Sequence, residues 1–118
     1  MALVPKVRTL LLAGLLAGLL VLAVSFTARA EPVVATYYDG AFAGAPTASE
    51  DPYDPYGFTA AHPYLPLGTE LLVSYDGSSV IVTVNDRCDC GLDLSLGAAR
   101  AIGLAGPVPV DVEVLGGP

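Results

Sequence analysis

Acidic side chains and a single imidazole are the groups in this sequence that suit acid–base chemistry. The carboxylic acids that merit attention are Glu50, Asp51, Asp54, Asp86 and Asp93. Asp86 closes an apolar run that begins at Val80, so we expect its carboxyl group to be partly desolvated, which favours the protonated form that a general acid needs. Side chains alternate along a strand, so Arg87 is expected to point elsewhere. The alternative is a turn at Asn85-Asp86, in which the carboxylate accepts hydrogen bonds from backbone amides.

His62 is the only histidine in the chain. As a functional residue it would orient Asp86 or bind a sugar hydroxyl, and the alternative is a packed structural residue in the extended backbone that Pro63 favours. The acids of residues 50–54 lack the regular spacing of a calcium loop, and a solvated loop is their simplest interpretation. We therefore expect no metal ion and no cofactor.

Aromatic side chains gather in one part of the sequence, between residues 37 and 64. They are Tyr37, Tyr38, Phe42, Tyr53, Tyr56, Phe58 and Tyr64. Tyrosine rings offer an apolar face for the C–H side of a sugar ring and a hydroxyl group for its polar edge. The competing role is core packing, which we expect for at least half of them.

The first 30 residues have the pattern of a secretory signal peptide. Lys6 and Arg8 precede the apolar run Leu10–Val24, and Ala28-Arg29-Ala30 forms a cleavage site. Cleavage after Ala30 leaves 88 of the 118 residues, enough for one domain, 31–118, that is free of the membrane. The alternative is retention of the apolar run as an anchor.

The charge of residues 31–118 limits the classes of partner. All twelve acids of the chain and only two of its five basic residues lie there, which gives a net charge of −10. Such a domain lacks the basic patch that nucleic acids or anionic membranes require. Neutral sugar polymers remain compatible with it.

The two cysteines, Cys88 and Cys90, fall in the exported part, where disulfide bonds persist. An even number fits one bridge, although a C-x-C loop is tight and must meet a narrow range of Cα separation. A two-cysteine metal site is the alternative, and it lacks further ligands.

Short β-rich segments dominate the secondary structure that the sequence predicts. The strands expected are 33–38, a hairpin of 70–75 and 80–84 around residues 76–79, and 107–115, with a short strand or turn at 58–61. Ser95 caps a helix over 96–102 that Gly103 ends. Because Val80, Val82 and Val84 share one face, the fold is expected to be a mainly β closed barrel or sandwich.

A series of sequence blocks resembles the catalytic domain of the rare lipoprotein A (RlpA) family. In chain order they are Ala35-Thr36-Tyr37-Tyr38, Thr47-Ala48-Ser49, Phe58-Thr59-Ala60-Ala61-His62, Leu65-Pro66-Leu67-Gly68-Thr69, Val82-Thr83-Val84-Asn85-Asp86-Arg87 and Asp93-Leu94-Ser95. The family consists of lytic transglycosylases with a six-stranded double-psi β-barrel, and expansins and barwin are similar in fold. The resemblance covers Val33 to Leu115 and implies this barrel with one or two short helices.

The resemblance also implies a reaction and its residues. Peptidoglycan strands would be cleaved, without water, at the β-1,4 bond between N-acetylmuramic acid and N-acetylglucosamine, leaving a 1,6-anhydro sugar. Asp86 matches the V-N-D-R aspartate as acid/base, and His62 matches the T-A-A-H histidine as its partner. Where the family has T-A-S-G-E, Asp51 stands for the catalytic glutamate and Glu50 for the glycine. The alternative is that a small loop shift gives Glu50 the role of the glutamate. The residues expected to bind substrate are Tyr37, Tyr38, Glu50, Thr59 and Asn85.

Two other functions remain open at this point. The aromatic segment and the altered Glu50-Asp51 pair are compatible with a non-catalytic, expansin-like module that binds or loosens cell-wall glycan. The acidic surface is compatible with a structural or protein-binding barrel. In each case we expect a secreted monomer.

Overall fold

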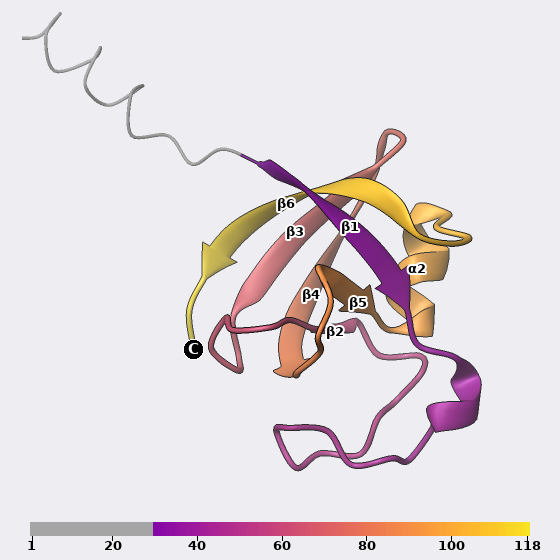
Figure 1. The fold of residues 1–118 in the computed structure, drawn as a ribbon, viewed down its shortest axis with the longest axis vertical. Coiled ribbons are helices and arrows are strands. Elements are labelled where there is room, and N and C mark those ends of the chain that lie inside the picture. Colours follow the sequence, from indigo (N-terminus) through magenta and orange to yellow (C-terminus); the bar gives the residue numbers. More distant parts are fainter. Residues whose placement is uncertain (1–29) are drawn as a thin grey trace, which may run out of the picture.

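The computed structural model describes residues 30–118, in which six strands close into one barrel (Figure 1). In chain order the elements are β1 (Glu31–Tyr37), the 3-10 helix η1 (Gly40–Phe42), β2 (Thr59–Ala61), β3 (Glu70–Tyr75), β4 (Ser78–Asp86), β5 (Leu92–Leu94), α2 (Leu96–Ile102) and β6 (Val108–Gly116). The predicted mainly β barrel is confirmed. The predicted signal peptide and its alternative as an anchor lie outside the described residues, apart from Ala30.

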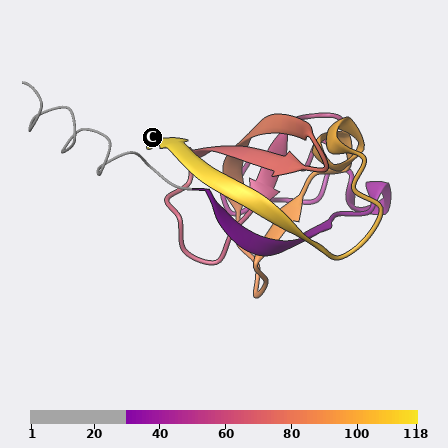
Figure 2. The same ribbon diagram turned by 90° about the horizontal axis from the view of Figure 1, so that it is seen from above.

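The strands follow one another around the barrel in the order β1-β5-β2-β4-β3-β6, and β6 pairs with β1 to close it (Figure 2). Two pairings are parallel, β1 with β5 and β2 with β4, and the others are antiparallel. The short strands β5 and β2 therefore lie between the ends of β1 and β4. This arrangement brings residues from distant parts of the sequence to one end of the barrel.

The interior of the barrel is aliphatic. Val80, Val82 and Val84 of β4 are all at most 6% exposed, whereas Ile81 between them is 52% exposed, so the predicted alternation is confirmed. Leu71 of β3 is also fully buried. Burial of such a side chain contributes about 1.5–3 kcal/mol to stability, so these residues form the part of the molecule that holds the site in place.

The aromatic residues lie mainly outside this core, and the prediction that at least half of them pack in it is wrong. Of the seven, Tyr53 alone is buried. Five are exposed large side chains: Tyr37, Phe42, Tyr56, Phe58 and Tyr64. The reason is geometric, because a six-stranded barrel has a narrow interior that valine, leucine and alanine already fill.

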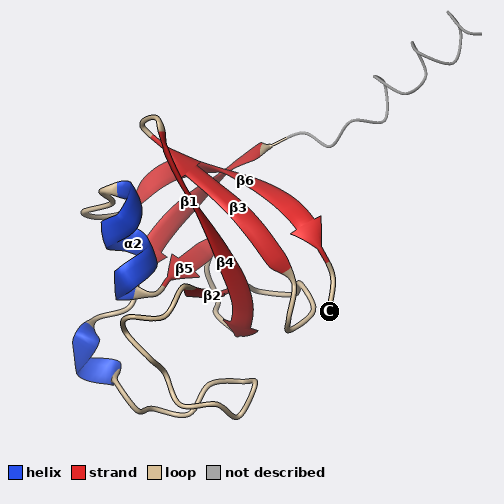
Figure 3. Cartoon of the chain, turned by 180° about the vertical axis from the view of Figure 1, so that it is seen from behind, coloured by secondary structure: helices blue, strands red, loops and turns tan. Residues whose placement is uncertain are grey.

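Local sequence signals explain the turn and the helix. Asp76 and Gly77 have φ values of 49° and 80°. Two successive positive φ values are typical of the two-residue hairpin turn that Asp-Gly favours. Ser78 and Ser79 therefore belong to β4 rather than to the turn. Ser95 caps α2 by accepting from the Ala98 N–H, and Gly103 ends the helix at φ 72°. Figure 3 shows α2 beside the strands. Within residues 30–118, no helix has both the length and the apolar character that a membrane crossing requires.

Candidate active site

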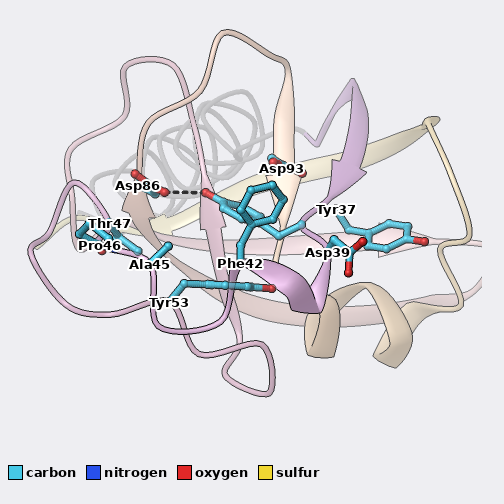
Figure 4. Close-up of a pocket in the computed structure, with 10 residues that line it drawn as sticks. Tyr37, Asp39, Phe42, Ala45, Pro46, Thr47, Tyr53, Asp86 and Asp93 are labelled. Carbon is cyan, nitrogen blue, oxygen red and sulfur yellow. Dashed lines mark hydrogen bonds between the residues drawn. The ribbon is translucent and has the colours of Figure 1, made fainter.

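The main cavity of the described residues, of about 430 Å³, lies where the β1–β2 connection faces the ends of β1, β4 and β5 (Figure 4). Its lining residues are Tyr37, Tyr38, Asp39, Phe42, Ala45, Pro46, Thr47, Tyr53, Asp86 and Asp93. The lining is thus aromatic and acidic, with no basic side chain. Three predicted site residues, Asp86, Tyr37 and Tyr38, are among them.

A bulge in the barrel directs Asp86 to this cavity. β2 and β4 pair Ala60 with Val84, but the register then shifts so that Ala61 faces Asp86 rather than Asn85. Ala61 also faces Asp93 on the other neighbouring strand, β5. Bulges commonly re-aim a side chain beside an active site. Here the bulge places two carboxylates on the strands that flank the small residue Ala61.

The Asp86 carboxylate is held by three donors. Its Oδ1 accepts from the backbone N–H groups of Ala48 and Arg87, each at 2.9 Å, and its Oδ2 accepts from the Tyr38 hydroxyl at 2.8 Å. The side chain is half-buried, and the residue belongs to β4, not to a turn. The alternative turn at Asn85-Asp86 predicted hydrogen bonds from backbone amides, and these are present. The carboxylate that accepts them nevertheless lies at the wall of an open cavity.

Tyr38 connects the two sides of the cavity. Its ring stacks on Tyr53 with centroids 4.8 Å apart, and the Tyr53 hydroxyl accepts from the Leu96 N–H at the start of α2. Burial, followed by the hydrogen bond to Asp86, raises the pKa of Tyr38 far above its usual value. Tyr38 therefore stays protonated and donates to Asp86. Burial also raises the pKa of Tyr53.

His62 does not face the Asp86 carboxylate, and the predicted side-chain bond between them is not found. The His62 Nδ1 accepts from the backbone N–H groups of Tyr64 and Leu65, at 3.2 and 3.1 Å. The ring lies in a separate hollow of about 290 Å³, edge-on to the Tyr64 ring. The link to Asp86 runs through the backbone, from the His62 N–H to the Asp86 carbonyl oxygen at 3.1 Å.

Arg87 belongs to the His62 side, as strand alternation predicted. Its guanidinium donates to the carbonyl oxygens of His62 and Leu65 and so closes the same turn. Desolvation, followed by the Arg87 charge, lowers the pKa of His62. The neutral imidazole, with Nδ1 free to accept, is the form that this turn needs.

The predicted third catalytic residue also lies away from the cavity. Asp51 and Glu50 are exposed and are not among the residues that line it. They belong to a tight loop in which the Thr47 N–H and hydroxyl both bond to the Asp51 carbonyl oxygen. Glu50 has φ 75°, a conformation that favours glycine, the residue of the family motif. The loop touches the site through Ala48, which donates to Asp86.

Thr59 and Asn85 act through their backbones in the structure. The Thr59 carbonyl oxygen accepts from the Ser95 N–H, and the Asn85 carbonyl oxygen accepts from the Ser49 N–H. Neither residue lines the main cavity. Their contacts instead join the β1–β2 connection and the start of α2 to the barrel.

Asp93 is one of the candidate acids of the sequence, but no catalytic or binding role was predicted for it. It lies on β5, half-buried, and its Oδ1 accepts from the Thr36 hydroxyl at 2.9 Å. Burial is the main cause that raises its pKa, the Thr36 hydrogen bond lowers it, and the charge of Asp86 raises it further. Its position in Asp93-Leu94-Ser95, one of the blocks that resemble the RlpA family, is the sequence signal that could have pointed to the site. Asp39 and Thr47 were likewise not predicted to line the site, whereas Phe42 and Tyr53 belong to the aromatic segment considered for contact with sugar rings.

The Cα atoms of Cys88 and Cys90 lie 5.2 Å apart, which is within the range for a disulfide bond. Their oxidation in the protein stays a prediction. Within the described residues no group of three or more acidic, histidine or cysteine side chains gathers in a way that would hold a metal ion.

Comparison with known proteins gives this barrel its family. The sequence profile of the family described as lytic transglycolase matches residues 30–113, and the chain belongs to that family. The "Probable endolytic peptidoglycan transglycosylase RlpA" of Nostoc sp. (strain PCC 7120) is 45% identical over 94 residues, which cover 70% of this chain and 25% of that protein. The "Endolytic peptidoglycan transglycosylase RlpA" of Pseudomonas aeruginosa is 45% identical over 96 residues, 73% of this chain and 28% of that protein.

Another relative is matched over almost its whole length. An uncharacterized protein of Synechocystis sp. is 44% identical over 85 residues, covering 69% of this chain and 94% of its own length. By contrast, the chain spans only about a quarter of the length of the RlpA relatives. The resemblance drawn from the sequence blocks, to an RlpA-like barrel, is confirmed at the level of family and fold.

Proposed function

We propose that this chain is a peptidoglycan lytic transglycosylase that cleaves the β-1,4 bond between N-acetylmuramic acid and N-acetylglucosamine and leaves 1,6-anhydro ends. The observation that carries the proposal is Asp86, a carboxyl group held by three donors at the wall of an open, aromatic cavity. The names of the Nostoc and Pseudomonas relatives, which describe them as endolytic peptidoglycan transglycosylases, support the same reaction and substrate.

The chemistry needs a proton donor and a proton acceptor but no water. A carboxyl group protonates the glycosidic oxygen as the bond to the anomeric carbon breaks, and a carboxylate takes the proton of the 6-hydroxyl as that oxygen attacks the same carbon. One acid/base can do both steps, which distinguishes the reaction from hydrolysis by two carboxylates around a water. Asp86 is the group we assign to this role.

The remaining predicted residues support Asp86 in different ways. His62 is a positioning residue, because it acts through the turn of residues 62–65 and the backbone bond to Asp86. The loop of Glu50 and Asp51 presents the Ala48 N–H to the same carboxylate. Tyr37 and Tyr38 offer aromatic faces to sugar rings along the cavity.

The substrate sets the location of the protein. Peptidoglycan lies outside the cytoplasm, so we propose export by the segment 1–30, a domain of residues 31–118 and action as a monomer on glycan strands in the cell envelope. The N-terminal residue and mass of the exported protein test this, and a start at Glu31 is expected. A protein that retains residues 1–30 would support the anchor instead.

Digestion of purified sacculi tests the activity. The wild type is expected to release anhydro-muropeptides detectable by mass spectrometry, and Asp86→Asn is expected to lower the rate by about 10²–10⁴-fold, the usual effect of a general acid or base. Asp111→Asn, an equal charge change at an exposed residue of β6 outside the cavity, is the matched control. Absence of anhydro product from the wild type, beside an active reference enzyme, would remove the proposal.

Glycan binding without cleavage is the second candidate. The five exposed aromatic side chains favour it, because they suit binding with or without chemistry. The wild type and Asp86→Asn would then bind insoluble peptidoglycan equally well, and neither would release product. A pull-down beside the digestion therefore separates the two functions.

A further inference from the structure

Asp93 is a second carboxyl group on the wall of the Asp86 cavity. It and Asp86 face the same residue, Ala61, from the two strands that flank β2. Two strand spacings place their Cα atoms about 10 Å apart. Ala61 between them has only a methyl side chain. Asp86 and Asp93 thus line one cavity (Figure 4).

The hydrogen bonds of the two groups differ. Asp86 accepts from three donors, which engage both of its oxygens. Asp93 accepts from a single hydroxyl, that of Thr36, at Oδ1, and no donor among residues 30–118 bonds its Oδ2. A proton can therefore reside on the Asp93 Oδ2 without breaking a hydrogen bond.

The charges around Asp93 favour its neutral form. The groups that face it are Asp86 on β4 and the hydroxyl groups of Tyr38 and Tyr53, and no basic side chain lines the cavity. Burial, opposed in part by the Thr36 bond and reinforced by the Asp86 charge, raises the pKa of Asp93. Two carboxyl groups in one site commonly divide their roles in this way.

We propose that Asp93 is a second catalytic residue, the general acid whose Oδ2 proton passes to the leaving glycosidic oxygen, while Asp86 acts as the base. The inference rests on the proposed function and divides its two proton transfers between two groups. As the bond from the anomeric carbon to that oxygen breaks, Asp93 becomes a carboxylate. The 6-hydroxyl oxygen bonds to the anomeric carbon and gives its proton to Asp86. Transfer of this proton from Asp86 to Asp93 through solvent restores both groups, with no net gain or loss.

A leaving group that needs no proton provides the test. Asp93→Asn and Asp86→Asn are compared on purified glycan strands and on a 4-methylumbelliferyl β-glycoside of a disaccharide that ends in N-acetylmuramic acid. Asp93→Asn is expected to lose about 100-fold or more in kcat on glycan strands, with little change in KM, yet to stay within a few-fold of wild type on the aryl glycoside. Asp86→Asn is expected to lose activity on both, and Asp111→Asn on neither.

The stability of Asp93→Asn separates chemistry from structure. In Asp93→Asn the amide oxygen can still accept from Thr36. The raised pKa of the Asp93 carboxyl group means that this group costs stability at neutral pH in the wild type. The unfolding free energy of the variant at pH 7 should therefore equal or exceed that of the wild type. Wild-type turnover of glycan strands by Asp93→Asn would overturn the proposal. Equal loss on both substrates would also overturn it. A wild type that makes no anhydro product from either substrate would instead remove the proposed function.

Discussion

The two sides of the end of β4 differ in how they use hydrogen bonds. On one side, the Asp86 carboxylate faces a cavity and is bound by donors from three separate places along the chain. On the other side, the side-chain nitrogens of His62 and Arg87 are engaged in one local turn of residues 62–65. The two sides therefore differ in purpose: one presents a carboxyl group to the cavity, and the other holds the backbone that carries this group.

The largest effect is expected on the Asp86 side, at Tyr38. Tyr38→Phe removes the hydroxyl bond to the Asp86 Oδ2 and keeps the ring that stacks on Tyr53. A hydrogen bond to a charged group contributes about 1.5–3 kcal/mol, so kcat should fall by about 10-fold or more, while the unfolding free energy changes less. Anhydro-product release measures the first and denaturant unfolding the second. Tyr56→Phe, at an exposed tyrosine outside the cavity, is the control, and equal effects of the two changes would break the comparison.

The sequence predicts the barrel well wherever a local signal suffices. Asp76-Gly77 fixes the hairpin, the valines of β4 fix the buried face, and Ser95 with Gly103 bound the helix. β5 escaped prediction because three residues, Leu92–Leu94, are too few to show a period. Its presence depends on parallel pairing with β1, a contact between residues more than fifty positions apart.

The direction of a side chain can be predicted from the sequence where strand alternation sets it, as for Arg87, but not where tertiary contacts set it. Asp86 was identified from its motif at a strand end, but its direction depends on the register shift opposite Ala61. The same shift brings it towards Asp93, a neighbour that sequence spacing alone cannot reveal. His62 was expected beside Asp86, yet its ring satisfies the N–H groups of its own turn.

The next effect tests the His62 side. His62→Ala leaves the Tyr64 and Leu65 N–H groups without their acceptor and should cost about 1 kcal/mol or more of unfolding free energy. His62→Asn is the matched variant, because its Oδ1 can accept from the same two N–H groups. If His62 only positions the turn, His62→Asn should recover both stability and most of kcat. Recovered stability without recovered kcat would assign the imidazole a direct part in the reaction.

A smaller effect is expected from pH. The folded-state pKa of His62 lies below its ordinary value of about 6.5. The folded protein therefore binds fewer protons than the unfolded chain in that range, and its stability falls as pH falls from 6.5 through the lowered pKa. The unfolding free energies of wild type and His62→Asn are measured at pH 7.5 and at pH 5.5, and their difference is compared between the two pH values. Both proteins have the same carboxyl groups, so the contribution of these groups to the pH dependence cancels in the difference. A difference that is independent of pH would show that the neutral imidazole is not required.

The smallest effect concerns the loop that holds Ala48 against Asp86. Glu50 occupies the left-handed region at φ 75°, which costs a side-chain-bearing residue about 1 kcal/mol. The flexibility of glycine in the unfolded chain offsets part of this, so Glu50→Gly should raise the unfolding free energy by only a few tenths of a kcal/mol. Gly77→Ala is the control in the opposite direction, because it adds a side chain at φ 80° where nothing else crowds it, and it should lower stability.

Because the exposed Glu50 carboxylate lies outside the cavity, kcat should not fall in Glu50→Gly. A large loss of kcat would mean that this acid enters the site when substrate binds, and the Asp86 side would then be less fully formed in the free protein than its three hydrogen bonds indicate.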